Sequence, residues 1–310
     1  MDFLITLQNV SVLFLLIIVG FIVGKLGIIS ENGQKELSNF VLKVTLPATI
    51  ILALQLEYTR ERFNISLNIM LIMIIVYVVT ITISKLLSRY YRVSTGQRDI
   101  IEVASVLPNT SFMGYPIVLS ILGEEALFYA VLGAGLVFEL IAWTYGNLTI
   151  SKSNGPTLNK RIIKTMLLSP GILSIAIGFT LFILRIKIPE PINSTLGFLS
   201  QASSPLAMIV VGILLSRSDI KKCILDGKLF LVAITRLLVF PFIVFITLNT
   251  LGVEGIVLTI PIVMLSMPPA AYVAMFSANA NNDTDLASQI IFIASLFSVI
   301  TIPLMVSLVG

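Results

Sequence analysis

The chain has 310 residues, of which 57% are hydrophobic and only 12% are charged, and its net charge is +4. Soluble domains carry roughly 25% charged residues, so this composition excludes a soluble protein and predicts a polytopic membrane protein in a lipid bilayer. Histidine is absent and Cys223 is the single cysteine. These counts exclude disulfides, serine–histidine hydrolysis, and metal or haem sites built on histidine or cysteine clusters. No cofactor and no metal are expected.

Ten apolar segments follow one another, each close to the roughly 20 residues that cross a bilayer as a helix. They are Leu4–Gly24, Leu37–Gln55, Ile65–Leu87, Ile100–Leu122, Ala126–Ile150, Met166–Leu184, Ile192–Leu215, Leu229–Leu248, Val253–Phe276 and Leu286–Leu308. The longest polar connection contains Asn154-Gly155-Pro156 and divides the chain into two halves. We therefore expect a five-helix repeat over residues 1–150, a cytoplasmic connecting loop over 151–164 and a second five-helix repeat over 165–310.

Lysines and arginines gather in alternate loops. Of the 20 basic residues, 14 lie in the odd-numbered loops and 4 in the even-numbered ones. Because basic loops stay in the cytoplasm, both termini are predicted to lie outside a bacterial-type cytoplasmic membrane. The same distribution explains the net positive charge without a nucleic-acid partner. Since each half has an odd number of helices, the second must be inserted upside down relative to the first.

Prolines interrupt the fourth and ninth segments at matching places. Pro108 and Pro268 lie 160 residues apart. Each proline removes a helical hydrogen-bond donor, and freed backbone at membrane depth must be buried in protein or line a polar cavity. A simple proline kink would explain one interruption alone. Two interruptions in an inverted repeat are the pattern of secondary transporters, whose site lies where the broken helices meet.

The stretch Asn109-Thr110-Ser111-Phe112-Met113-Gly114-Tyr115-Pro116 resembles the Asn-Thr-x-Phe-x-Gly-x-Pro signature of the auxin efflux carrier family. This family of secondary transporters includes plant auxin carriers and bacterial malate or malonate permeases. Pro268-Pro269-Ala270-Ala271 and Leu46-Pro47-Ala48 are similar to other recurring features of the family, and the likeness covers essentially the whole chain.

The resemblance implies an all-α fold of ten transmembrane helices in a 5+5 inverted repeat, with broken helices four and nine crossing at their prolines. Helices one, two, six and seven would form a scaffold that often dimerises, so a homodimer is expected on this ground. Helices three to five and eight to ten would form a transport domain that moves against the scaffold, which gives alternating access. The chain lacks the long central loop of some plant members, so regulation through that loop is not implied.

Two half-helix N-termini at such a crossing would each carry roughly +0.5 of an elementary charge, which favours an anionic substrate. Asn109 and Thr110 can add donors, and Gln201 with Ser203 and Ser204 places polar groups at mid-depth of the seventh segment. For the two serines, bonding back to their own helix is the alternative. The predicted substrate-binding residues are Pro108, Asn109, Thr110, Ser111, Gly114, Pro116, Gln201, Ser204, Met267, Pro268 and Pro269.

Charged residues inside spans cost about 2.5–3.5 kcal/mol each at mid-helix. Glu139 is the deepest, and Arg236 lies at a depth that differs by roughly 6 Å at 1.5 Å per residue. Glu139 is therefore either a proton or cation carrier or the partner of Arg236 in a structural ion pair. Lys43 can extend from the second segment to the lipid headgroups.

Four other residues near cytoplasmic ends have plainer interpretations. Asp99 and Glu102 begin the fourth segment beside basic residues and predict a solvated helix start. Trp143 and Tyr145 lie near the inner end of the fifth segment and predict anchors in the membrane interface.

These features together predict a secondary active transporter of small organic anions, namely mono- or dicarboxylates of the malate, malonate or auxin type. The chain has no G-x-x-x-x-G-K-[ST] loop, so direct use of ATP is not expected, and neither is an enzyme. The alternatives are a sodium-coupled carboxylate or bile-acid-type symporter and, more remotely, a membrane receptor or channel. The sequence leaves open whether a proton or sodium is the coupling ion, and whether the direction is import or export.

Overall fold

The structure, a computed structural model, describes residues 3–152, 160–217 and 226–309. Within these ranges every regular element is helical, and one isolated β-bridge joins Pro108 to Pro269. Residues 153–159, which belong to the predicted connecting loop, and Cys223 lie outside the described residues.

Three of the first helices begin with side-chain caps. The elements are α1 (Phe3–Lys25), α2 (Glu31–Phe40), η1 (Val41–Thr45), α3 (Leu46–Ala53), α4 (Arg60–Ser88) and α5 (Thr95–Val106). Ser30, Thr59 and Ser94 each accept a hydrogen bond from the amide three residues later, which satisfies one of the free donors at a helix start. The second span therefore begins at Glu31, six residues before the predicted Leu37, because its first turns are polar but capped.

A long helical stretch follows α5 and contains a sharp break. It consists of η2 (Thr110–Gly114), α6 (Tyr115–Tyr129), η3 (Ala130–Gly135), α7 (Leu136–Ile141), η4 (Ala142–Gly146) and α8 (Asn147–Ile150). Gly123 inside α6 has a φ of 82°, a conformation that glycine adopts at little cost. Two helices therefore meet at Gly123, where the sequence predicts the boundary between the fourth and fifth segments.

The remaining described elements are again α-helices, with one π-helical turn, η6. They are α9 (Lys160–Leu167), α10 (Pro170–Leu184), α11 (Glu190–Ser216), α13 (Gly227–Ile234), η6 (Thr235–Val239), α14 (Phe240–Thr250), α15 (Gly255–Leu265), α16 (Tyr272–Asn279) and α17 (Thr284–Val309). Like α5, α15 ends where the chain reaches a proline-containing stretch, and a short helix continues beyond it.

The outward faces of these helices are apolar. Six helical stretches in the described residues are long and apolar enough to cross a membrane, and three shorter apolar helices accompany them. Large side chains such as Leu15, Leu71 and Ile75 are about 60% exposed and lie on the outside of α1 and α4. An apolar exterior of this extent suits lipid and not water, so the chain is a multi-pass membrane protein.

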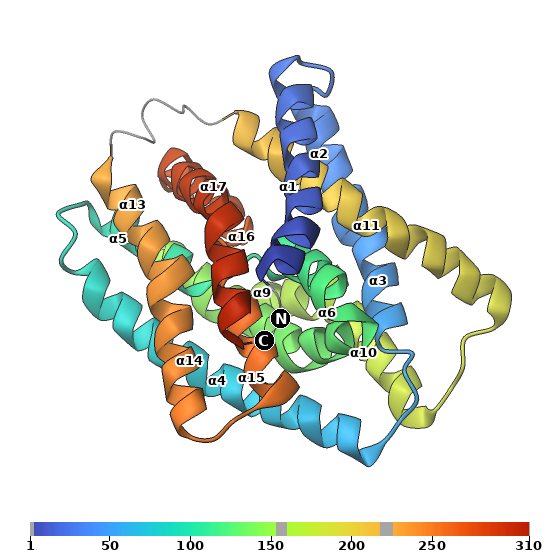
Figure 1. The fold of residues 1–310 in the computed structure, drawn as a ribbon. Helices are drawn as coiled ribbons and strands as arrows, with labels where there is room; N and C mark the ends of the chain where they lie inside the picture. Colours follow the sequence, from blue (N-terminus) through green and yellow to red (C-terminus); the bar gives the residue numbers. More distant parts are fainter. Residues whose placement is uncertain (1–2, 153–159, 218–225, 310) are drawn as a thin grey trace.

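The helices pack in two groups (Figure 1). In the first group α11 contacts α1, α2 and α3, and α3 contacts α10; in Figure 1 α1 and α2 lie at the top, while α3, α11 and α10 lie on the right. In the second group α4 packs on α5 and α15, while α17 packs on α13, α15 and α16. Fewer contacts join the groups, chiefly α1 with α17 and α6, and α11 with η2.

The contact between α1 and α11 depends on small residues. A β-carbon at Gly20 would overlap the Ile209 carbonyl, and one at Gly212 would overlap the Ile17 carbonyl. Such close approach of two backbones is how membrane helices gain packing energy without a hydrophobic driving force between them.

Candidate functional site

Two interruptions of the helices satisfy each other's backbone. After α5 the chain becomes extended at Leu107, with φ −87° and ψ 110°. The Asn109 amide donates to the Pro268 carbonyl at 2.7 Å, and the Ala270 amide donates to the Leu107 carbonyl at 2.9 Å. We call these paired segments, residues 107–109 and 268–270, the crossing. Backbone that leaves a helix inside a membrane protein needs such partners, because unpaired groups there cost several kcal/mol.

Asn109 caps the helix that resumes after the crossing. Its side-chain oxygen accepts from the Phe112 amide at 3.3 Å, and its carbonyl accepts from the Gly114 amide at 2.9 Å. Asn109, Thr110 and Ser111 are all buried. A β-carbon on Gly114 would lie 3.2 Å from the Met264 side chain, so a larger residue there would push η2 away from α15.

Arg236 joins the ends of α5 and α15 at the crossing. It is fully buried on η6, and its Nε donates to the Met267 carbonyl at 3.2 Å. One of its terminal nitrogens lies 3.4 Å from the carbonyls of both Ser105 and Val106. Ser105 and Val106 are the last residues of α5, and Met267 comes two residues after the end of α15. The C-termini of helices carry partial negative charge. The guanidinium therefore neutralises two helix ends at once.

The predicted ion pair between Glu139 and Arg236 is absent from the described part of the chain. The three salt bridges found there involve other residues. The Arg236 guanidinium donates instead to the carbonyls of Met267, Ser105 and Val106 beside the crossing. Similar depth in the membrane did not imply contact, because depth does not fix the direction in which a side chain points.

Glu139 has a different partner. It is 3% exposed on α7, and both of its carboxyl oxygens accept from the Tyr272 hydroxyl, at 3.3 and 3.4 Å. A β-carbon on Gly171 of α10 would lie 2.8 Å from the same carboxyl group. The carboxyl group is thus enclosed between the first residue of α16 and the start of α10.

The predictions for the start of the fourth segment and the end of the fifth need correction. Glu102 is buried, and it accepts hydrogen bonds from the Tyr145 hydroxyl at 2.6 Å and from Ser88 at 3.4 Å. It is therefore not part of a solvated helix start, because the end of the fifth segment covers it. Tyr145 is its donor and not an interfacial anchor. Trp143 likewise packs inward, with its ring 5.5 Å from that of Phe276.

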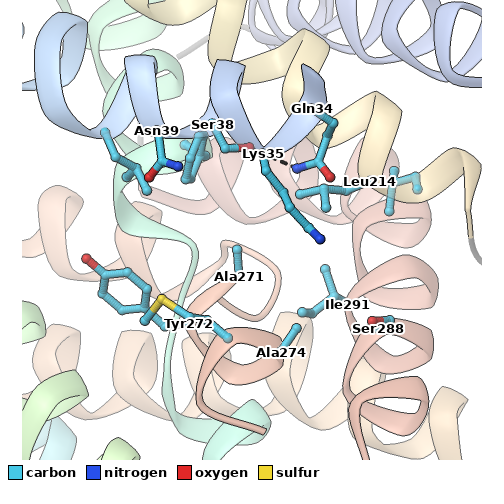
Figure 2. A pocket seen from close by; sticks show the side chains of 14 residues that line it. Gln34, Lys35, Ser38, Asn39, Leu214, Ala271, Tyr272, Ala274, Ser288 and Ile291 are labelled. Carbon is cyan, nitrogen blue, oxygen red and sulfur yellow. Dashed lines mark hydrogen bonds between the residues drawn. The ribbon is translucent and has the colours of Figure 1, made fainter. Parts of the chain in front are cut away.

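A cavity of about 400 Å³ lies beside the crossing, between the two packing groups. Figure 2 shows side chains of α2 above it and those of α16 and α17 on the opposite side. Lys35 extends from α2 into this space (Figure 2) and is the charged side chain among the described lining residues. Its ammonium group pairs with exposed Glu31 at 2.9 Å. Exposed pairs of this kind contribute about 0–1 kcal/mol, so Lys35 can exchange this partner for another anion at little cost.

The sequence did not single out most of these lining residues. It places Lys35 in a loop, whereas α2 presents Gln34, Lys35, Ser38 and Asn39 to the cavity. The signal was available: Ser30 is a capping residue, and Gln34 and Ser38 share a helix face at a spacing of four. From the two interruptions, Phe112, Ala271 and Tyr272 reach the cavity.

The predicted substrate-binding residues occupy three different positions. Pro108, Asn109, Thr110 and Ser111 are buried at the crossing or in η2, and none of them lines either cavity. Gly114 in η2, Pro116 at the start of α6, Met267 just before the crossing, and Pro268 and Pro269 within it are buried as well. Gln201 lines a second cavity of about 570 Å³, together with Gln55, Glu124 and Asn193. Ser204, three residues further along α11, is half-buried and lines neither cavity.

Comparison with known proteins agrees with the motif in η2. A family model described as membrane transport protein matches residues 5–306. The chain belongs to this family, which is the auxin efflux carrier family that its motifs resemble. An uncharacterized transporter from Methanocaldococcus jannaschii is 28% identical over 97% of this chain and 98% of its own length. An uncharacterized transporter from Methanothermobacter thermautotrophicus is also 28% identical, over 98% of each chain. The chain is a membrane transporter.

Proposed function

We propose that this transporter moves small organic anions, mono- or dicarboxylates of the malate, malonate or auxin type, by alternating access. The observation that carries the proposal is the 400 Å³ cavity, which is lined by Ala271 and Tyr272, directly after the crossing, and into which Lys35 extends. Its volume lies in the range of small-molecule sites, about 300–1,000 Å³. Lys35 can pair with one carboxylate of such an anion, and Gln34, Ser38 and Asn39 on the same helix place polar groups beside it.

The proposed architecture is ten transmembrane helices in a 5+5 inverted repeat, over residues 1–150 and 165–310. The first packing group would be the scaffold and the second the transport domain, with the fourth and ninth spans broken at the crossing. The backbone bridge between Pro108 and Pro269 supports this arrangement. A homodimer formed through the scaffold is part of the proposal on family grounds.

The positions of the two cavities support an orientation in the cell membrane with both termini outside. The 400 Å³ cavity is lined near the start of α2 and the end of α11, next to loops rich in lysine and arginine. The 570 Å³ cavity is lined by Gln55 and Asn193, at the other ends of the same two spans. In this orientation the first cavity opens to the cytoplasm and the second to the outside.

The test is uptake of labelled malate, malonate and an aromatic carboxylate into proteoliposomes. We expect saturable uptake of at least one of them by the wild-type chain. Lys35→Gln should raise KM about fivefold, the equivalent of about 1 kcal/mol for a partly exposed charge, and should leave kcat nearly unchanged. Lys43→Gln is the matched control, because Lys43 is an exposed lysine on the same span that does not line the cavity.

Two results would contradict the proposal. The substrate class is wrong if none of the three carboxylates moves under any gradient. The cavity is not the site if Lys35→Gln and Lys43→Gln change KM equally.

A further inference from the structure

We infer that Glu139 binds the proton that is coupled to transport, and that Tyr272 links the state of Glu139 to the occupancy of the 400 Å³ cavity. This inference rests on the proposed function and adds to it the coupling ion and the residues that hold it. It follows from three observations: how the carbonyls at the crossing are used, what surrounds Glu139, and where Tyr272 lies.

The carbonyls at the crossing already have a cation. In transporters with discontinuous helices, unwound carbonyls and half-helix C-termini coordinate sodium. Here the carbonyls of Ser105, Val106 and Met267 face the Arg236 guanidinium. Arg236 is covalently attached and is charged at any physiological pH. A sodium ion would have to displace it, so the oxygen atoms that normally bind sodium are occupied by the protein itself.

Glu139 lies among neutral groups in the described structure. Tyr272 of α16 donates to it, and Tyr77 on α4 and Tyr115 on α6, both buried, lie near enough to interact with it electrostatically. Trp143 on η4 lies next to Tyr272, and the backbone of Gly171 on α10 lies against the carboxyl group. Arg236 interacts electrostatically with Tyr77, but its Nε donates to the Met267 carbonyl and it forms no salt bridge with Glu139 among the described residues. An isolated carboxylate is far costlier to bury than a neutral carboxyl group, so binding and release of a proton here has a large effect on local energy.

Tyr272 touches both the carboxyl group and the cavity. Its hydroxyl bonds Glu139, while the residue also lines the 400 Å³ cavity and begins α16. An ionised Glu139 can only accept a hydrogen bond from Tyr272, whereas a protonated Glu139 can donate one to it. A change of protonation therefore reverses or releases this bond at the wall of the cavity. The added proton also cancels one negative charge of a bound carboxylate, which lowers the cost of moving the loaded site through the membrane.

The experiment uses the full chain in proteoliposomes with labelled malate and the voltage held at zero. For one proton per malate, each pH unit of gradient should raise equilibrium accumulation about tenfold. A sodium gradient at equal pH should have no effect. Glu139→Gln should retain malate counterflow and lose the response to pH, and Tyr272→Phe should weaken that response. Glu125→Gln, a carboxylate exposed on the surface and paired with Arg62, is the control and should respond like the wild type.

Infrared difference spectroscopy of the purified protein between acidic and alkaline pH gives a readout that needs no substrate. We expect a protonated-carboxyl band that disappears in Glu139→Gln. The inference is overturned if sodium drives malate uptake, if Glu139→Gln still responds to the pH gradient, or if no carboxyl band belongs to Glu139. Failure of counterflow in every variant with malate, malonate and the aromatic carboxylate contradicts the proposed substrate class instead, and the infrared band still decides whether Glu139 binds a proton. If Glu139→Gln does not fold, Glu139→Asp should keep the response with a shifted pH dependence.

Discussion

The crossing and the α1–α11 contact are stabilised in opposite ways. At the crossing, the backbone leaves the helix, and Arg236, Asn109 and the paired segments supply hydrogen bonds that the helix no longer makes. Between α1 and α11 the backbone is regular, and missing side chains at Gly20 and Gly212 allow close contact. Polar contacts are therefore concentrated where the backbone is irregular. Substitutions in the two regions should therefore have different effects. Those at the crossing should lower both stability and transport, and those in the α1–α11 contact should lower stability alone.

The largest effect is expected from Arg236→Met. This change keeps most of the side-chain volume but leaves three carbonyls without their donor, and unsatisfied buried groups cost about 1–3 kcal/mol each. We expect a loss of about 3 kcal/mol or more, measured as a lower thermal unfolding temperature in detergent. Arg236→Lys should lose less. Arg92→Met, at an exposed arginine, should unfold like the wild type; an equal loss in both would show that the bonds at the crossing contribute little.

A smaller effect is expected from Gly212→Ala in the α1–α11 contact. The new β-carbon overlaps backbone atoms of Ile17 and Phe21, which cannot move independently, and overpacking of this kind costs about 1–3 kcal/mol. The same unfolding assay should show a loss of about 2 kcal/mol, while the KM of the protein that remains folded should be unchanged. Gly197→Ala on the same helix meets no neighbouring atom within 4 Å. If Gly197→Ala lowers the unfolding temperature as much as Gly212→Ala does, close packing is not the cause of the loss.

The smallest effect on stability, and the sharpest separation of the regions, is expected from a pair of capping variants. Asn109→Ala and Thr59→Ala each remove one side-chain acceptor at a helix start, and loss of such a cap costs about 1 kcal/mol. We expect similar unfolding temperatures for the two variants. Uptake should fall only in Asn109→Ala, because Asn109 belongs to the crossing, whereas Thr59 caps α4 and does not belong to it. Equal uptake would remove the crossing from the transport mechanism.

Local signals in the sequence placed some of these features well and missed others. Composition establishes the membrane class, and the motif around Asn109 establishes the family, because both depend on neighbouring residues. Proline positions point to the places where α5 and α15 end, since a proline affects its own turn of helix. The partners of Arg236 and Glu139 could not be predicted, because they depend on the rotation of each helix about its axis, which the spacing of apolar residues in a nearly all-apolar helix does not fix.

The position of Lys35 was missed for a related reason. A hydropathy threshold assigns a polar first turn to a loop, although Ser30 caps that turn and α2 already begins at Glu31. Glu102 was misplaced because the residues that cover it, including Tyr145, come 43 positions later in the chain.

The arrangement of the crossing also bears on the order of events during synthesis. Arg236 contacts a carbonyl 131 residues earlier in the chain, and the Asn109 amide depends on Pro268. A chain synthesised from its N-terminus therefore inserts its first half before either partner exists, with unpaired backbone groups near Leu107. Since such groups are costly in lipid, the nascent first half must keep this stretch hydrated or covered by other proteins. The crossing is then complete only after Arg236 and Pro268 have been added to the chain.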